Sequence, residues 1–228
     1  MKRFGQLAVI LLGLLAWYAV AIAADYFLVG VWGLTSGTRF ALLGAAELIL
    51  GGGVIFLALR LAGIRPAEIG WTSRHIVPDV LVGLMIAVVF AVLQFAVIIP
   101  ATGGAGRSDI VANAAQIGET YPGLFGMLLL ALLGSTSEEL LFRGLLLGGI
   151  AMAFNGGTTA RVLATAIVIV LFALSHGYQG WAGVVDTGFF GGLLLSVIYW
   201  WRGMRLAAPI AAHVGWNVIA SITIFSIY

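Results

Sequence analysis

Residues 122–150, with the sequence PGLFGMLLLALLGSTSEELLFRGLLLGGI, form an apolar run that is long enough to cross a lipid bilayer as a helix. A transmembrane helix needs about 20 consecutive, mostly apolar residues. Comparable runs recur along the whole chain and predict an all-α protein, a polytopic transmembrane bundle of about seven helices. The predicted spans are residues 5–24, 40–62, 79–99, 122–150, 160–176, 184–201 and 207–227.

The composition agrees with a protein whose surroundings are mostly lipid. The chain is 62% hydrophobic and only 9% charged, whereas an ordinary soluble domain is about 25% charged. It contains no cysteine, which excludes disulfides, thiol nucleophiles and cysteine metal ligands. The net charge of +2 and the lack of a basic patch argue against nucleic acid as a partner, and the lipid bilayer is the expected environment.

The first apolar run, residues 5–24, follows a basic start and contains an Ala-x-Ala sequence, so it also resembles a signal peptide. Its length of about 20 apolar residues favours a transmembrane helix. The hydrophilic linkers between runs are short, and no soluble domain or repeat interrupts them. Residues 1–228 are therefore predicted to form a single integral-membrane domain, in which residues 1–100 contribute helices and a cytoplasmic linker.

The basic residues predict the orientation, because cytoplasmic loops of membrane proteins are rich in Lys and Arg. With the N-terminus in the cytoplasm, the outside keeps only Arg39 and Arg107. The cytoplasmic side then collects Lys2, Arg3, Arg60, Arg65, Arg74, Arg161, Arg202 and Arg205. The single lysine and the preference for Ala, Gly and Arg hint at a prokaryotic source. We expect a multi-pass protein of the cell (inner or cytoplasmic) membrane.

Ionisable and amide side chains inside the spans are the candidates for function. Such residues cost about 2.5–3.5 kcal/mol at mid-bilayer when charged, so they usually face a cavity or a partner. The sequence suggests no role for the first of them, Glu47. The set comprises Glu47, Gln94, Glu138, Glu139, Arg143, His176, Asp186, His213 and Asn217.

The segment GSTSEELLFR, residues 134–143, places two adjacent glutamates and one arginine on a helix. Glu139 and Arg143 are one turn apart on the same face and can form an ion pair. Glu138 points about 100° away and has no such partner. An unpaired carboxylate there suits a general base or acid, and the small residues before it would let water or a substrate backbone approach. Alternatively, the pair clamps two helices and Glu138 faces a polar lumen.

Two further patterns contain histidine. His176 follows FALS near a helix end, a place that is also common for histidines of no catalytic role. His213 and Asn217, in HVGWN, are one turn apart and project from one face of the last helix. They can donate two hydrogen bonds to one point, which is how an oxyanion is stabilised. They can equally hydrogen-bond across a helix interface.

These patterns together resemble the CPBP family, which includes type II CAAX prenyl endopeptidases and bacterial proteins for bacteriocin processing or self-immunity. EELLFR matches its Glu-Glu-x-x-x-Arg motif, FALSH its Phe-x-x-x-His motif and HVGWN its His-x-x-x-Asn motif, in family order. The resemblance covers residues 120–228, which are the predicted catalytic core.

The resemblance implies an intramembrane endopeptidase and assigns a role to each matching residue. Glu138 would activate water, and His176 would hold and polarise it. His213 and Asn217 would stabilise the oxyanion, with Glu139 and Arg143 as support. Glu138, His176 and His213 could instead hold zinc, since two histidines and a carboxylate leave an open coordination position. The helix with His-Glu-x-x-His is absent, which favours a mechanism that requires no cofactor.

The expected partner is a peptide or small membrane-associated protein, cleaved in maturation at a C-terminal tail or a leader. A non-catalytic immunity or assembly protein that keeps the peptide cavity is the alternative. A transporter would carry repeat-related polar sites in both halves, whereas here these residues concentrate in the second half. Straight helices would also place His176 at a different depth from Glu138 and His213, so a later start or a strong tilt of the fifth helix is expected.

Overall fold

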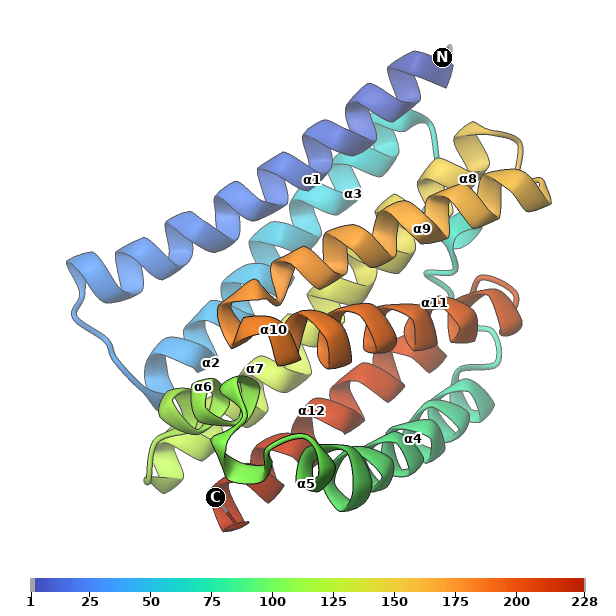
Figure 1. Cartoon of the computed structure of the whole chain (residues 1–228). Helices are drawn as coiled ribbons and strands as arrows, with labels where there is room; N and C mark the ends of the chain where they lie inside the picture. The colour runs from blue at the N-terminus through green and yellow to red at the C-terminus, as the bar shows by residue number, and fades with distance from the viewer. Residues whose placement is uncertain (1–2, 228) are drawn as a thin grey trace.

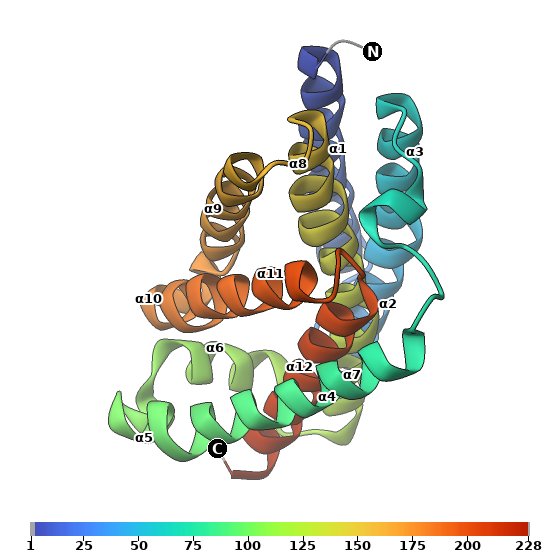
Figure 2. The ribbon, with the colours of Figure 1, turned by 90° about the vertical axis from the view of Figure 1, so that its right-hand side faces the viewer.

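The structure is a computed structural model that describes residues 3–227, and every regular element in that range is helical (Figures 1 and 2). Seven helical segments are long and apolar enough to cross a membrane. The prediction of an all-α transmembrane bundle of about seven helices is therefore confirmed, and the chain is a multi-pass membrane protein.

Four of the spans lie in the first two thirds of the chain, and each combines α-helix with a π-helical segment of wider turns. The first span is α1 with η1, the second α2, η2 and α3, the third α4, η4 and α5, and the fourth α7, η6 and α8. Their bounds are α1 (Arg3–Tyr26), η1 (Phe27–Val31), α2 (Gly37–Ala46), η2 (Glu47–Gly51), α3 (Gly52–Ala62), α4 (Ile76–Leu93), η4 (Gln94–Ile98), α5 (Ile99–Ala101), α7 (Tyr121–Glu139), η6 (Leu140–Gly148) and α8 (Gly149–Ala153).

The last three spans are shorter. The seventh begins and ends where it was predicted, whereas the fifth ends one residue before His176, where glycines follow and break the helix. These spans comprise α9 (Thr158–Ser175), then η7 (Gly177–Gln179), α10 (Gly180–Ala182), η8 (Gly183–Gly191) and α11 (Gly192–Trp201), then α12 (Ala207–Ile227).

Two predicted linkers contain helices of their own. The stretch 63–78 holds the short 3₁₀ helix η3 (Pro66–Ile69). The stretch 100–121 was expected to be only a linker, but it contains η5 (Gly104–Gly106) and α6 (Ser108–Ile117). Its hydrophilic composition concealed a helix that is too short to cross a membrane and that packs against α7 and α12 instead.

The fourth span is the central helix of the bundle. Thr120 caps it by accepting a hydrogen bond from the Gly123 amide (3.2 Å), and Pro122 suits the first turn. Every residue from 139 to 151 is buried, so this stretch is covered on all sides. Glu138 and Glu139, near the midpoint of this span, are therefore positioned by a helix that is packed firmly against its neighbours.

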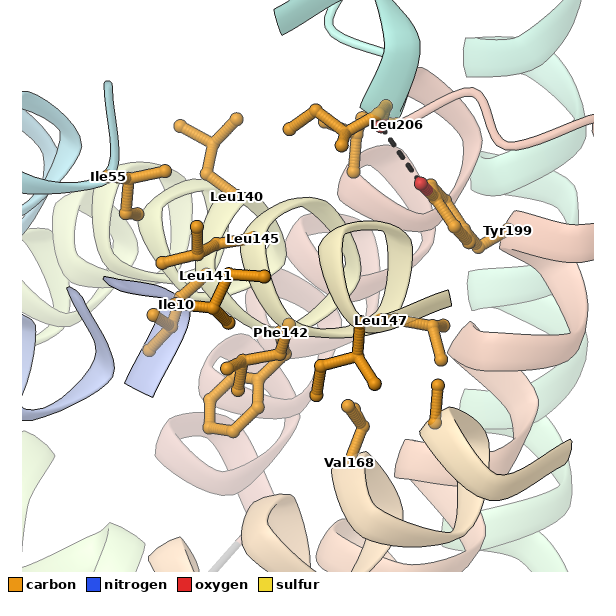
Figure 3. Packing of buried hydrophobic residues seen from close by; sticks show 14 of the residues in the cluster. Ile10, Ile55, Leu140, Leu141, Phe142, Leu145, Leu147, Val168, Tyr199 and Leu206 are labelled. Carbon is orange, nitrogen blue, oxygen red and sulfur yellow. Dashed lines mark hydrogen bonds between the residues drawn. The ribbon is translucent and has the colours of Figure 1, made fainter. Parts of the chain in front are cut away.

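The hydrophobic core surrounds this central helix (Figure 3). Its η6 side chains meet residues of the first, second, fifth and sixth spans, and the hydroxyl of Tyr199 donates to the carbonyl of Ile69 (3.0 Å, dashed line in Figure 3). That bond ties the sixth span to η3. The labelled core residues are Ile10, Ile55, Leu140, Leu141, Phe142, Leu145, Leu147, Val168, Tyr199 and Leu206.

The chain enters and leaves the bundle at opposite ends (Figure 1), as an odd number of crossings requires. We call these the Arg3 end and the Asp25 end, after residues near the two ends of the first span. The Arg3 end gathers the loops and helix ends that carry six of the arginines used above to predict orientation; Lys2 lies outside the described residues. Those arginines are Arg60, Arg65, Arg74, Arg161, Arg202 and Arg205. Whether this end faces the cytoplasm stays a prediction.

The orientation can be tested with cysteine labelling, because the natural chain contains no cysteine. Ser73→Cys places a thiol in an exposed loop at the Arg3 end, and Ser36→Cys places one in an exposed loop at the Asp25 end. In intact cells, a membrane-impermeant maleimide should label Ser36→Cys at once and Ser73→Cys only after permeabilisation. The reverse pattern would contradict the predicted orientation.

Candidate active site

One cavity of about 490 Å³ brings together side chains from the second, third, fourth and seventh spans, from α6 and from the turn after α9. All four residues predicted to be catalytic line it: Glu138, His176, His213 and Asn217. The fifth helix begins at Thr158, so a later start does not explain how these residues meet. The helices cross one another at clear angles (Figure 2). This agrees with the other expectation, that strong tilt brings His176 to the same depth as Glu138 and His213.

The predicted contact between Glu139 and Arg143 is present, and both side chains are completely buried. Arg143 Nη1 lies 2.7 Å from Glu139 Oε1. Its Nη2 donates to the carbonyl of Gly192 at 2.9 Å, and its guanidinium carbon stands 4.5 Å from the ring centroid of Phe172. The arginine thus joins the central helix to the sixth and fifth spans.

Glu139 also holds His213, a contact that the sequence did not reveal. The same oxygen, Oε1, lies 2.8 Å from Nδ1 of His213. An ionised carboxylate only accepts hydrogen bonds, so Nδ1 carries the proton and Nε2 is left for the cavity. The two residues are 74 positions apart in the chain, and no local pattern links them. Glu139 therefore orients the imidazole as well as pairing with Arg143.

Glu138 lies next to this buried cluster but faces the cavity. Its side chain is 30% exposed, whereas that of Glu139 is fully buried. Glu138 Oε2 is 3.9 Å from Nε2 of His213, too far for a direct hydrogen bond and close enough for one water to bridge. The π-helix η6 begins two residues later, and such segments are frequent at functional sites.

His176 is buried at the C-terminal cap of α9. Its Nδ1 lies 2.8 Å from the carbonyl oxygen of Phe172 and donates a hydrogen bond to it, so Nε2 of the neutral ring carries the lone pair. The Phe172 ring stands between the two histidines, 4.6 Å from His176 and 5.8 Å from His213 between ring centroids. The first residue of the FALSH pattern thus sets the spacing of the imidazoles.

Asn217 shares the cavity with His213, one turn further along α12. Its amide nitrogen donates to Ser135 Oγ at 2.9 Å, which leaves one amide hydrogen for a ligand. Of the small residues before Glu138, Gly134 and Ser135 line the cavity as expected. Ser137 does not, because it accepts from the Trp17 indole (2.9 Å) and donates to a backbone carbonyl of η2 (2.6 Å).

The zinc alternative requires Glu138, His176 and His213 to converge on one point. Among residues 3–227, no group of three or more His, Asp or Glu side chains is arranged to hold a metal ion. The three predicted donors are therefore not arranged as ligands of one metal ion in this structure.

Residues without a predicted role complete the cavity wall. Gln94 accepts a hydrogen bond from the indole of Trp216 at 2.7 Å, while Glu47 is the first residue of η2. Both are polar side chains inside predicted spans, but nothing in the sequence connects them to the motifs. Asn113 and Gln116 belong to α6, whose hydrophilic composition predicts a linker and gives no signal that they line a cavity.

Helix α6 is fixed over the cavity by a buried ion cluster. Arg107, just before the helix, contacts Asp109 at 2.7 Å and Asp186 of the sixth span at 2.6 Å. Burial acts to lower the pKa of Arg107, but the hydrogen bonds that it donates to both aspartates outweigh this effect and raise the pKa above its usual value. The cluster ties α6 to η8.

Comparison with protein families matches residues 120–219 to the family described as type II CAAX prenyl endopeptidase Rce1-like. Residues 120–219 are a CPBP family domain. All six predicted site residues lie within this domain, and the resemblance drawn from three short motifs is confirmed at the level of the family. No match is found among curated proteins or solved structures. The CPBP family is one of intramembrane proteases, so the domain is a possible protease.

The buried pair of the CPBP domain gives a prediction about stability. Arg143→Met leaves the Glu139 carboxylate without its cation and should cost about 3–5 kcal/mol of unfolding free energy. The double variant Glu139→Gln/Arg143→Met removes both charges and should recover most of that loss. Unfolding in mixed detergent micelles measures both.

Arg39→Met is the matched control, because its pair with Asp25 is partly exposed and should contribute only about 0–1 kcal/mol. If Arg143→Met and Arg39→Met lose the same stability, the central role of the buried pair is wrong.

Proposed function

We propose that the protein is an intramembrane endopeptidase that hydrolyses a peptide bond of a membrane-associated peptide or protein. The observation that supports this most strongly is the arrangement of Glu138 and His213. A carboxylate and an oriented imidazole nitrogen face each other at 3.9 Å beside a cavity, within helices long enough to cross a membrane. That is the arrangement needed to bind and deprotonate one water.

Glu138 is the general base in this proposal. It takes a proton from water, and the resulting hydroxide attacks the carbonyl carbon of the peptide bond. Glu138 then gives the proton to the amide nitrogen, the C–N bond breaks, and the products are a carboxylic acid and an amine. One carboxylate thereby serves both halves of the reaction.

Three side chains assist the base. His176, whose Nε2 is free, holds and polarises the water. Asn217 and His213, one turn apart on α12, donate to the oxyanion of the tetrahedral intermediate, His213 when its Nε2 carries a proton. Glu139 and Arg143 do not touch the substrate in this scheme, since both are buried; they fix the orientation of His213.

The substrate reaches Glu138 from the Asp25 end. Three residues of the second span at intervals of four, Arg39 and Leu43 in α2 and Glu47 at the start of η2, line the cavity in a row from that end towards the catalytic glutamate. If the Arg3 end is cytoplasmic, as the arginines predict, the cavity receives its substrate from outside the cytoplasm. Leader peptides and C-terminal tails of exported or membrane-attached proteins are substrates that fit.

The proposal is tested by comparing Glu138→Gln and His213→Gln with the natural protein in cells of the source organism. General acid–base catalysis contributes about 10²–10⁴-fold in rate, so we expect both variants to accumulate the same uncleaved precursor in mass spectrometry of membrane and secreted peptides. Glu68→Gln, at a partly exposed position of η3 at the Arg3 end, is the matched control and should process normally.

If Glu138→Gln and His213→Gln are present at normal amounts and process every peptide as the natural protein does, the protease proposal is wrong. The cavity would then belong to a binding protein, such as an immunity or assembly factor.

We also propose that no metal is required, which predicts resistance to chelation. Treating the purified protein with 1,10-phenanthroline should leave the cleavage rate within about twofold, because the donors present do not converge on an ion. Elemental analysis of the same sample should find less than one metal ion per ten chains. Loss of cleavage that is restored by zinc would contradict this part of the proposal.

A further inference from the structure

Glu47 is a buried carboxylate to which the catalytic scheme gives no task. It is only 9% exposed and lines the cavity. Within residues 3–227, its carboxylate takes part in no hydrogen bond and no ion pair; only its backbone carbonyl is bonded, to Ser137. A carboxylate that is largely shielded from bulk water and has no partner is costly when ionised, so a positively charged ligand group in the cavity would stabilise the ionised form.

The structure makes room for this carboxylate beside the central helix. A Cβ atom at Gly134 would lie 2.9 Å from Glu47 Oε2, so the glycine leaves the space that the carboxylate fills. Gly134 and Glu138 are one helical turn apart on the same face, about 5–6 Å. The Glu47 carboxylate therefore lies about one turn from the catalytic one, on the side of the Asp25 end.

The arginine that lines the cavity, Arg39, and the arginine next to the cavity, Arg107, are both engaged by aspartates. Arg39 makes two hydrogen bonds to Asp25, at 2.9 and 3.0 Å. Arg107 is held by Asp109 and Asp186. Among the described residues that line the cavity, the carboxyl groups without a cationic side chain at hydrogen-bond distance are Glu47 and Glu138, so these two are left to receive a positively charged group of a ligand.

We infer that Glu47 is a specificity residue that binds a positively charged group of the substrate, an ammonium or guanidinium, close to the scissile bond. This inference rests on the proposed endopeptidase function and extends it to substrate class. An extended peptide advances about 3.3 Å per residue, so the basic residue lies within about three residues of the bond that is cut. A free α-amine of a short substrate has the same chemistry.

The test uses quenched fluorescent decapeptides of alternating Leu and Ala, assayed with the protein in liposomes. One lysine is moved along the peptide, and each peptide is paired with one that contains acetyl-lysine at the same place. A second arm compares free and acetylated N-termini in peptides without lysine, which separates a side-chain ammonium from an α-amine.

With the natural protein, at least one position or terminus should show a kcat/KM at least tenfold higher for the charged peptide. Glu47→Gln should abolish the preference by raising KM for that peptide, with kcat unchanged and the neutral peptide unaffected. Glu68→Gln should keep the preference. Gly134→Ala, which retains the Glu47 charge but crowds it, should weaken the preference and serves if Glu47→Gln does not fold.

Two results would overturn the inference. If Glu47→Gln keeps the preference, another group recognises the charge. If Glu47→Gln lowers kcat equally for charged and neutral peptides, Glu47 takes part in proton transfer. Binding can be measured without cleavage in the Glu138→Gln variant. This variant should bind the charged peptide with a lower dissociation constant than the neutral peptide, and the double variant Glu47→Gln/Glu138→Gln should bind the two peptides equally. If the natural protein binds with this preference but cleaves no peptide, the proposed function fails and the binding site stands.

Discussion

The carboxylate of Glu139 is the point on which the arrangement of the cavity depends. One oxygen receives both the guanidinium of Arg143 and the imidazole of His213, so a single buried group positions the central helix, the last helix and, through Arg143, the start of α11. Buried ion pairs contribute little net stability because desolvation opposes the attraction. Their geometry, however, is strict. A helix bundle held together by apolar side chains tolerates small sliding of its members, and this polar junction fixes their register where chemistry would need it.

The different surroundings of the adjacent residues Glu138 and Glu139 follow from helical geometry. Successive residues of an α-helix point about 100° apart, so one carboxylate can be enclosed by protein while its neighbour faces a cavity. The enclosed Glu139 holds other side chains still, and Glu138 meets whatever enters. The packed core makes this separation possible, because every residue from 139 to 151 is buried, whereas Glu138, one residue before this stretch, lines the cavity.

The sequence was sufficient for the spans, since their apolar length is a property of the chain alone, and for the pairing of Glu139 with Arg143, which is one turn away. It was also sufficient for the family, because the three motifs are local. It could not reveal the bond from Glu139 to His213 or that from Asn217 to Ser135, which join residues far apart in the chain. The sequence does not predict helix α6, because the hydrophilic composition of this segment resembles that of a linker. The sequence identifies Glu47 as an ionisable residue inside a span, but its contact with Gly134 forms only when the second and fourth spans pack together.

The ion cluster beneath α6 differs from the charges at the mouth of the cavity in how it responds to salt. Arg107 and Asp109 are almost entirely shielded from solvent, whereas Asp25 and Arg39 are partly exposed. Dissolved ions screen exposed charges over about 8 Å at physiological ionic strength and reach buried ones much less. The ion cluster that holds α6 is therefore weakened little by salt, whereas the attraction between Asp25 and Arg39 at the rim falls as salt rises. The position of α6 over the cavity should accordingly change little between low and high ionic strength, and the charges at the rim are the ones whose effect depends on the medium.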